Sequence, residues 1–450
     1  MVDSASPPAF APTLPAQRSE GIDFARGLAL FGILLVNARF FFWPFASAID
    51  PNCAVPGLES STLDAVVWSI IEAFCSFKFI SLFSMLFGFG IAAQANKAMR
   101  AGLSRWGFGS RRFVVLLAFG LLHATLVWYG DILVVYALFG FLVLAICVCK
   151  PRTILIWFFV LAGLLAVVSL CGGVLVYIFG TYPNFLSESI GDAEADQVGR
   201  MAAQVRTPLV EGGLDARGIE AMREVFGSGQ FSFADPRWMR AEMLAYQEGP
   251  WFDLFAFRMV HWLVCLSAAI FGYGWHACAL MLFGAYAFRC GLFELAARAR
   301  RVRLGWTCLS LGSMAAILSV LPFWLFGLSD PLAGACHMIG LTASGLALPI
   351  GYATLLIEYA PRVPHAIRHP VASAGRMALT VYLCESILAT ALASWWGGAL
   401  FAKLGDTALA MVSLGVWSAL VILAWLWLTR FRIGPAEWLW RRLSYGRGPL

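Results

Sequence analysis

Residues 111–140, RRFVVLLAFGLLHATLVWYGDILVVYALFG, contain one apolar run and the start of a second that continues to Cys149, each about 18 residues long and joined by a tight corner at residues 128–131. This pattern predicts a hairpin of two transmembrane helices. His123 lies inside the first run, roughly 16 Å beyond the Arg111-Arg112 pair at the usual helical rise. An imidazole in hydrocarbon is costly unless it faces a partner or a water-filled cavity, so His123 is a candidate functional residue. The alternative is a structural histidine with a satisfied hydrogen bond.

The composition is that of a membrane protein. Of the 450 residues, 60% are hydrophobic and 13% are charged, which excludes an ordinary soluble domain. The net charge of +6 comes from short basic clusters between apolar runs, so it indicates topology rather than nucleic-acid binding. All but one of the 11 cysteines fall in or beside apolar runs, and no disulfide framework or metal-ligand spacing is present. The sequence also lacks a P-loop, a GxSxG and an HExxH motif.

The alternation of apolar runs and basic loops predicts an all-α polytopic bundle of about ten transmembrane helices around a central polar cavity. The expected segments are a disordered N-terminal tail (1–17), an N-terminal transmembrane half of five spans (18–179), an extracytoplasmic polar segment with surface helices (180–250), a C-terminal transmembrane half (251–430) and a basic cytoplasmic tail (431–450). Region 251–292 is ambiguous. We expect one full crossing there and one interfacial or re-entrant piece, because the arginines at 298–303 belong inside.

Polar side chains inside the apolar runs are the main indicators of chemistry. Asn37 lies in the first span at a depth similar to that of His123, and its alternative role is an interhelical hydrogen bond. Asp131 precedes the second run of the hairpin, where it could equally cap the helix. Lys78 either snorkels to an interface or lines a polar cavity. The run after Gly375 supplies further candidates for substrate binding: Arg376, Tyr382, Glu385 and Ser386. The last three share one helix side at the 3 to 4 residue spacing.

Several segments together resemble the YeiB-like family of bacterial inner-membrane proteins, a domain of unknown function. They are RSEGIDFARGLALFGILLVN (18–37), Lys78-Phe79 with LFSMLFGFG (82–90), Arg111-Arg112 with His123 and GDILVVYALFG (130–140), Gly375-Arg376-Met377 with Thr380 and Tyr382, and Gly434-Pro435 with Glu437-Trp438. The family is similar to a branch of a wider transmembrane acyltransferase superfamily. That resemblance implies helices around a central cavity, with cytosolic acyl-CoA or acetyl-CoA as donor and an acceptor on the far side of the membrane. Surface-glycan acylases of the superfamily carry a histidine near the end of the first span, where this chain has Asn37.

The resulting hypothesis is acyl transfer with His123 as general base. Asp131 would fix its tautomer, and Asn37 or Lys78 would stabilise the oxyanion. Basic residues at the inside mouth would bind the coenzyme A phosphates, although positive-inside bias alone also explains them. They are Arg26, Arg100, Arg105, Arg111 and Arg112.

Two other functions stay open. The first is a transporter or exporter of a small or lipidic molecule, with Glu385, Lys78 and His123 as a relay. The second is a non-catalytic lipid-binding protein whose buried polar groups specify packing. The expected location is a bacterial inner membrane, with both termini cytoplasmic. Membrane lipids are the expected partners and a second copy of the chain is a candidate partner, whereas nucleic acid and a metal are not expected. His365 and His369 lie in a Pro-rich inside loop and are interpreted as solvated.

Overall fold

The computed structural model of the chain describes residues 19–182 and 232–445, whose regular structure is helical throughout. The predicted tail at 1–17 and most of the predicted segment with surface helices lie outside the described residues. Before the gap the helices are α1 (Glu20–Phe42), α2 (Phe45–Ile49), α3 (Thr62–Phe74), α4 (Lys78–Arg100), α5 (Arg105–Leu126), α6 (Leu133–Ile146) and α7 (Pro151–Thr181). After it come α11 (Pro236–Gln247), α12 (Trp251–Ala268), α13 (Gly274–Arg289), α14 (Arg298–Phe326), α15 (Pro331–Tyr359), α16 (His365–Arg376), α17 (Ala378–Ala393), α18 (Asp406–Arg430) and α19 (Pro435–Tyr445).

The helices confirm the predicted polytopic bundle. Within the described residues, eight helical stretches are long and apolar enough to cross a membrane, or nine if the bent pair α16 and α17 forms one span. Helix α6 is apolar but shorter. The apolar runs of the sequence are largely helical, and in the ambiguous region 251–292 a π-helical turn, Ala269–Tyr273, lies between α12 and α13.

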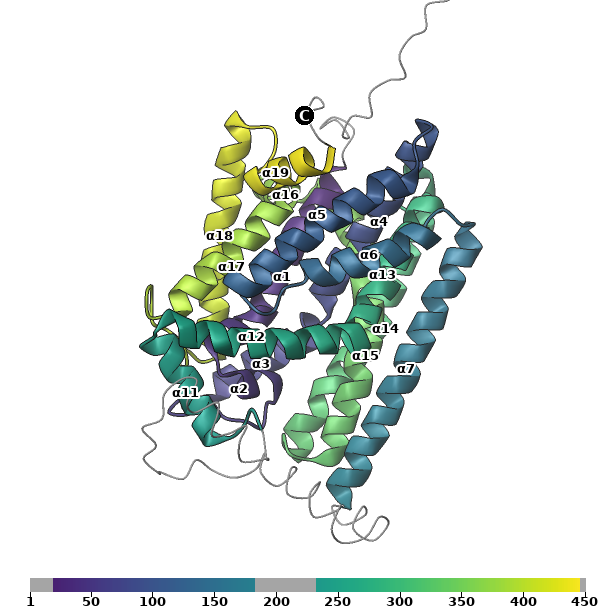
Figure 1. Cartoon of the computed structure of the whole chain (residues 1–450). Coiled ribbons are helices and arrows are strands. Elements are labelled where there is room, and N and C mark those ends of the chain that lie inside the picture. The colour runs from purple at the N-terminus through teal and green to yellow at the C-terminus, as the bar shows by residue number, and fades with distance from the viewer. Residues whose placement is uncertain (1–18, 183–231, 446–450) are drawn as a thin grey trace, which may run out of the picture.

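Figure 1 shows how the bundle is arranged. Helix α7 runs beside α13 and α15 at one edge, and α16 to α19 form the opposite side. Helix α12 lies across the neighbouring helices (Figure 1). The start of α1 and helix α19 lie at one end of the molecule, whereas α2 and α11 lie at the other (Figure 1).

Two predicted spans differ from their expected form. The run at 371–393 is not one straight helix, because α16 and α17 meet at an angle of 87° around Met377. The hairpin is also asymmetric: α5 spans 22 residues and α6 only 14. Since α5 begins at Arg105 and ends at Leu126, His123 lies in its last turn rather than near the middle of a span.

The hairpin corner is buried inside the protein. Trp128 is 3% exposed and Tyr129 is 1% exposed, and both pack in an aromatic cluster with residues of α1, α2 and α12. The Tyr129 hydroxyl donates a hydrogen bond to the Phe40 carbonyl at 2.8 Å. Irregular backbone at membrane depth is tolerated where protein covers it, which explains why the corner is sealed by aromatic side chains.

Glycines set the closest helix crossings. A Cβ on Gly88 of α4 would come within 2.0 Å of the Met281 carbonyl oxygen, and one on Gly284 of α13 would lie 1.8 Å from the Met85 carbonyl oxygen. Helices α1 and α16 cross in the same way, at Gly27 and at Gly375. Small residues such as Gly88 therefore let the backbones of neighbouring helices come into direct contact.

Candidate functional site

A cavity of about 240 Å³ opens between α1, α4, α5, α6, α16, α17 and α19. Its inner walls are apolar and aromatic, with Leu30, Ile33, Phe83 and Phe87 among them. Six cationic side chains from five helices line it as well, and we call them the basic rim: Arg26, Lys97, Arg105, Arg112, Arg376 and Arg441. An apolar pocket with a cationic rim suits a ligand that has an apolar part and an anionic part.

Three of the five arginines predicted to bind a cofactor belong to this rim. They are Arg26, Arg105 and Arg112, whereas Arg100 is exposed at the end of α4 and does not line the cavity. Arg111 also points elsewhere, because its Nε donates a hydrogen bond to the Leu443 carbonyl at 3.1 Å. The Arg112 guanidinium lies 4.4 Å from the centre of the Trp440 ring, so α19 holds it in place by a cation–π contact.

Helix α19 is fixed to the start of α17 by Glu437. This carboxyl group accepts hydrogen bonds from the Leu379 N–H at 2.7 Å and from the Thr380 hydroxyl at 2.6 Å. Burial raises the pKa of Glu437, although these hydrogen bonds favour the ionised form. Gly434 permits the approach, since a Cβ there would come within 2.2 Å of Glu437 Oε2. The Gly434-Pro435 and Glu437-Trp438 pattern thus closes one wall of the cavity.

His123 and Asp131 form a buried pair at the hairpin corner. His123 Nδ1 lies 2.8 Å from Asp131 Oδ2, and the two side chains are 2% and 0% exposed. Asp131 Oδ1 accepts the Val134 N–H at 2.8 Å, so the carboxylate also caps the start of α6. Asp131 therefore caps α6 and contacts His123 at the same time, and its functional role stays a prediction. Gly120 allows this packing, because a Cβ there would approach Asp131 Oδ1 to 2.8 Å.

The second ring nitrogen of His123 is buried and has no hydrogen-bond partner in the described part of the chain. With a carboxylate on Nδ1, the neutral imidazole carries its proton there, and Nε2 presents a lone pair. His123 does not itself line the cavity. Tyr382 does, and its ring centroid lies 5.1 Å from that of His123. The Tyr382 hydroxyl accepts the Ile132 N–H at 3.4 Å, so Tyr382 forms the wall between the cavity and the histidine.

The other predicted substrate residues are divided between the cavity and the packed interior. Arg376 lines the cavity, but Glu385 and Ser386 are buried on α17 beyond Tyr382. Glu385 Oε1 has no hydrogen-bond partner within the described residues. Glu385 lies along α17 between Tyr382, which contacts His123, and Thr390, whose hydroxyl donates to the Val127 carbonyl at 3.4 Å.

Lys78 and Asn37 lie away from the cavity lining. Lys78 is completely buried, and its amine donates a hydrogen bond to the Glu72 carbonyl at 3.0 Å, where α3 gives way to α4. Asn37 is half-buried on α1. Neither residue lines the cavity, so the structure does not bring them together with Tyr382.

A second histidine–carboxylate pair packs against the hairpin corner, where the ring centroid of His261 lies 5.1 Å from that of Tyr129. His261 Nδ1 of α12 is 3.7 Å from Glu242 Oε1 of α11, and both side chains are buried. Phe45 stacks on the His261 ring at 4.5 Å, and its N–H donates to both Glu242 oxygens at 3.2 Å. Burial raises the pKa of Glu242 to about 8. The contact between these two residues could not be predicted from the sequence, because Glu242 lies in a polar segment and His261 in an ambiguous run.

Comparison with known proteins supports the resemblance seen in the sequence. The family described as "Protein of unknown function (DUF418)" matches residues 287–447. The uncharacterized protein YxaH of Bacillus subtilis (strain 168) is 28% identical over 96% of this chain and 96% of its own length. The uncharacterized protein YeiB of Escherichia coli (strain K12) is 26% identical over 95% of this chain and 96% of its own length. No solved structure gives a significant match. The family match over α14 to α19, together with two relatives aligned over nearly their whole length, agrees with the resemblance of this chain to the YeiB-like family.

Proposed function

We propose that this chain is a membrane-embedded acyltransferase that moves an acyl group from acyl-CoA to a hydroxyl or amine acceptor. The observation that carries the proposal is the buried His123–Asp131 pair, whose Nε2 has no partner in the described part of the chain and which lies behind one wall of a basic-rimmed cavity. A histidine held by a carboxylate on one nitrogen and free on the other is the arrangement of a general base.

In this mechanism His123 Nε2 takes the proton of the acceptor as its oxygen or nitrogen bonds to the thioester carbon. The carbon–sulfur bond then breaks, and the proton passes from Nε2 to the departing sulfur to give the free thiol of coenzyme A. Asp131 keeps the Nδ1 proton in place and stabilises the imidazolium during the step. Tyr382 must turn for the reactants to meet Nε2, and its hydroxyl would then be a donor for the oxyanion. Lys78 and Asn37 take no part in this step, because neither side chain lines the cavity.

The cavity supports a donor that enters from the basic rim. The phosphates of coenzyme A would contact the arginines, whose planar guanidinium groups match phosphate geometry. The acyl chain and pantetheine arm would lie along Leu30, Phe83 and Phe87. We further propose that the rim faces the cytoplasm of a bacterial inner membrane, where the positive-inside bias would place it.

The test is thioester cleavage by the purified full chain in detergent or nanodiscs. Acetyl-CoA, propionyl-CoA and longer donors are incubated with the native protein, with His123→Ala and with His337→Ala as a histidine control outside the site. We expect slow release of free coenzyme A that His123→Ala reduces by about 100-fold or more and that His337→Ala leaves unchanged. Absence of binding and cleavage across all donors would refute the proposal, provided the protein melts cooperatively.

A transporter or exporter is the second candidate, and Glu385 favours it. A buried carboxyl without a partner in the described bundle is typical of proton-coupled carriers. This function predicts proton-coupled flux in liposomes without any acyl donor, and loss of that coupling in Glu385→Gln. Flux that is absent, together with thioester cleavage that requires His123, would select the enzyme.

A further inference from the structure

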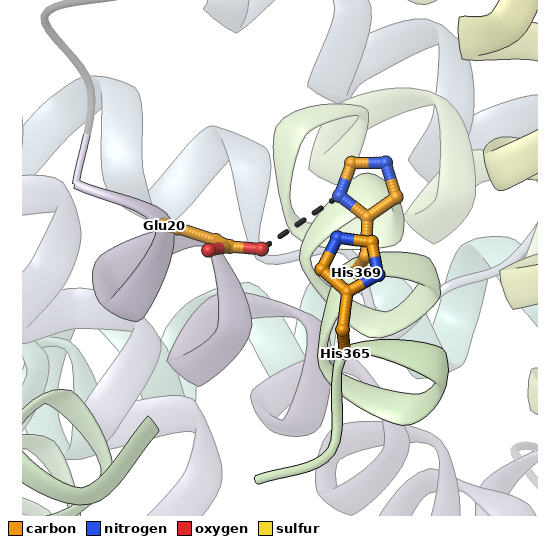
Figure 2. A group of neighbouring side chains, drawn as sticks. All are labelled: Glu20, His365 and His369. Atoms are coloured by element: carbon orange, nitrogen blue, oxygen red, sulfur yellow. Dashed lines mark ion pairs between the residues drawn. The ribbon is translucent and has the colours of Figure 1, made fainter. Parts of the chain in front are cut away.

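Three side chains with metal-ligating atoms meet outside the cavity, at the starts of α1 and α16. They are Glu20, His365 and His369, and one ligand atom from each lies within 4.8 Å of the other two. Figure 2 shows Glu20 projecting from α1 toward the two imidazoles of α16. We propose that these residues bind one divalent cation of the Zn²⁺ and Ni²⁺ class. The site is independent of the acyl transfer proposed above.

Helix α16 brings the two histidines together. Residues four apart lie on one side of a helix, and the rings of His365 and His369 stack with centroids 4.9 Å apart and an interplanar angle of 11°. Two imidazoles in this spacing form half of a tetrahedral site. Because the pair begins the helix, it lies at the protein surface, where a cation reaches it directly.

A residue of α16 also orients the Glu20 carboxylate of α1. Arg368 Nε lies 3.2 Å from Glu20 Oε2, while Glu20 Oε1 lies 3.7 Å from His369 Nδ1. Arg368 therefore orients the Glu20 carboxylate so that one oxygen faces the histidines. Residues that contact metal ligands commonly orient them in this way. The close crossing of α1 and α16 at Gly27 and Gly375 fixes the separation of the two backbones.

Only a small movement of the three side chains is needed to bring their ligand atoms to the separation found around Zn²⁺. Ligand atoms around a tetrahedral Zn²⁺ are about 3.3 Å apart when each bond is about 2.0 Å long, so the three atoms need only draw slightly closer. The side chains of Glu20 and His369 are 43% and 42% exposed, which leaves them free to change rotamer. A rigid backbone pair with mobile ligands thus meets the geometric requirement.

The ligand types select the metal. Imidazole suits Zn²⁺, Ni²⁺ and Cu²⁺, whereas Mg²⁺ demands oxygen ligands in an octahedron. Three protein ligands leave a position for water. The nearby positive charge of Arg368 opposes the cation, so we expect modest affinity.

A cation at this place would restrain the mouth of the cavity. Helix α1 carries Arg26 and helix α16 carries Arg376, both members of the basic rim. Tying the first turns of these helices together would hold the two arginines at a fixed separation. Since the cation binds the folded chain only, it would also raise the thermal stability of the protein.

The experiment titrates Zn²⁺, Ni²⁺ and Mg²⁺ into the tag-free full chain in detergent after EDTA treatment, with calorimetry and melting temperature as readouts. We expect one Zn²⁺ or Ni²⁺ per chain, no binding of Mg²⁺, and a rise in melting temperature with Zn²⁺. Each of Glu20→Gln, His365→Ala and His369→Ala should weaken Zn²⁺ binding by about 10-fold or more, and the double histidine variant should abolish it.

The matched control is His337→Ala. His337 Nε2 lies 3.5 Å from Glu72 Oε1, so it is another accessible histidine–carboxylate pair, yet it lacks a second histidine. This variant should bind Zn²⁺ as the native chain does. The inference is wrong if the native chain binds no Zn²⁺ or Ni²⁺, or if binding survives in the double variant that melts normally in EDTA.

Discussion

At the scale of single residues, Asp131 decides which nitrogen of His123 is free. Its carboxylate accepts the Nδ1 proton, and replacement by asparagine would place an amide donor there and move the proton to Nε2. We expect Asp131→Asn to lower thioester cleavage by about 100-fold or more, with little loss of stability because the amide oxygen still caps α6. The measurement is coenzyme A release, compared with Asp253→Asn in α12. An unchanged rate would show that the pair is only structural.

Glu242 gives the protein a pH dependence of its own. Burial raises the pKa of Glu242 from its ordinary value of 4.5 to about 8, so the folded state favours the protonated carboxyl. Its contribution to stability is therefore fully present below about pH 4.5 and is lost as the pH rises through about 8. We expect the melting temperature of Glu242→Gln to depend less on pH between about 4.5 and 8 than that of the native chain. At about pH 8 and above, the variant should melt at a higher temperature than the native chain. A native chain whose stability rises over this interval would contradict the assignment.

At the scale of helices, reciprocal glycine contacts hold α4 against α13. Because the carbonyl of Met85 occupies the space beside Gly284, a larger side chain must push the helices apart. We expect Gly284→Leu to destabilise the protein by about 2 kcal/mol or more and to lower its melting temperature. Gly415→Leu in α18 is the control, since nothing lies within 4 Å of a Cβ there. Equal melting temperatures of the two variants would show that α4 and α13 are not in close contact at Gly284.

The helices also explain why the hairpin was only partly predictable. Apolar length indicates a helix, but it does not show that α6 ends at Ile146 or that the corner lies beneath aromatic side chains from α1 and α12. His123 was singled out because an imidazole in an apolar run is costly. Its partner Asp131 could be predicted because it lies only eight residues away, whereas Tyr382 reaches it from α17.

Across the whole protein, arginines that lie in similar basic loops of the sequence differ in whether they belong to the basic rim. Arg105 begins α5 and lines the cavity, whereas Arg100 ends α4 and is exposed. If acyl-CoA enters at the rim, Arg105→Gln should weaken coenzyme A binding by about 10-fold through loss of a charge-assisted contact, and Arg100→Gln should not. Calorimetry with coenzyme A measures both. Equal effects would indicate that the arginines report topology alone.

Local sequence alone is enough to predict the class of the protein and most of its helices, together with an expected topology. These follow from local hydropathy and from the charge of short loops, which act residue by residue along the chain. Tertiary structure alone decided the bend at Met377, the pairing of His261 with Glu242, the exclusion of Arg100 and Arg111 from the cavity, and the meeting of Glu20 with two histidines. Each of these depends on side chains or backbones brought together by helix crossings, and the distances at a crossing are set by packing between distant segments rather than by the residues next to them in the chain.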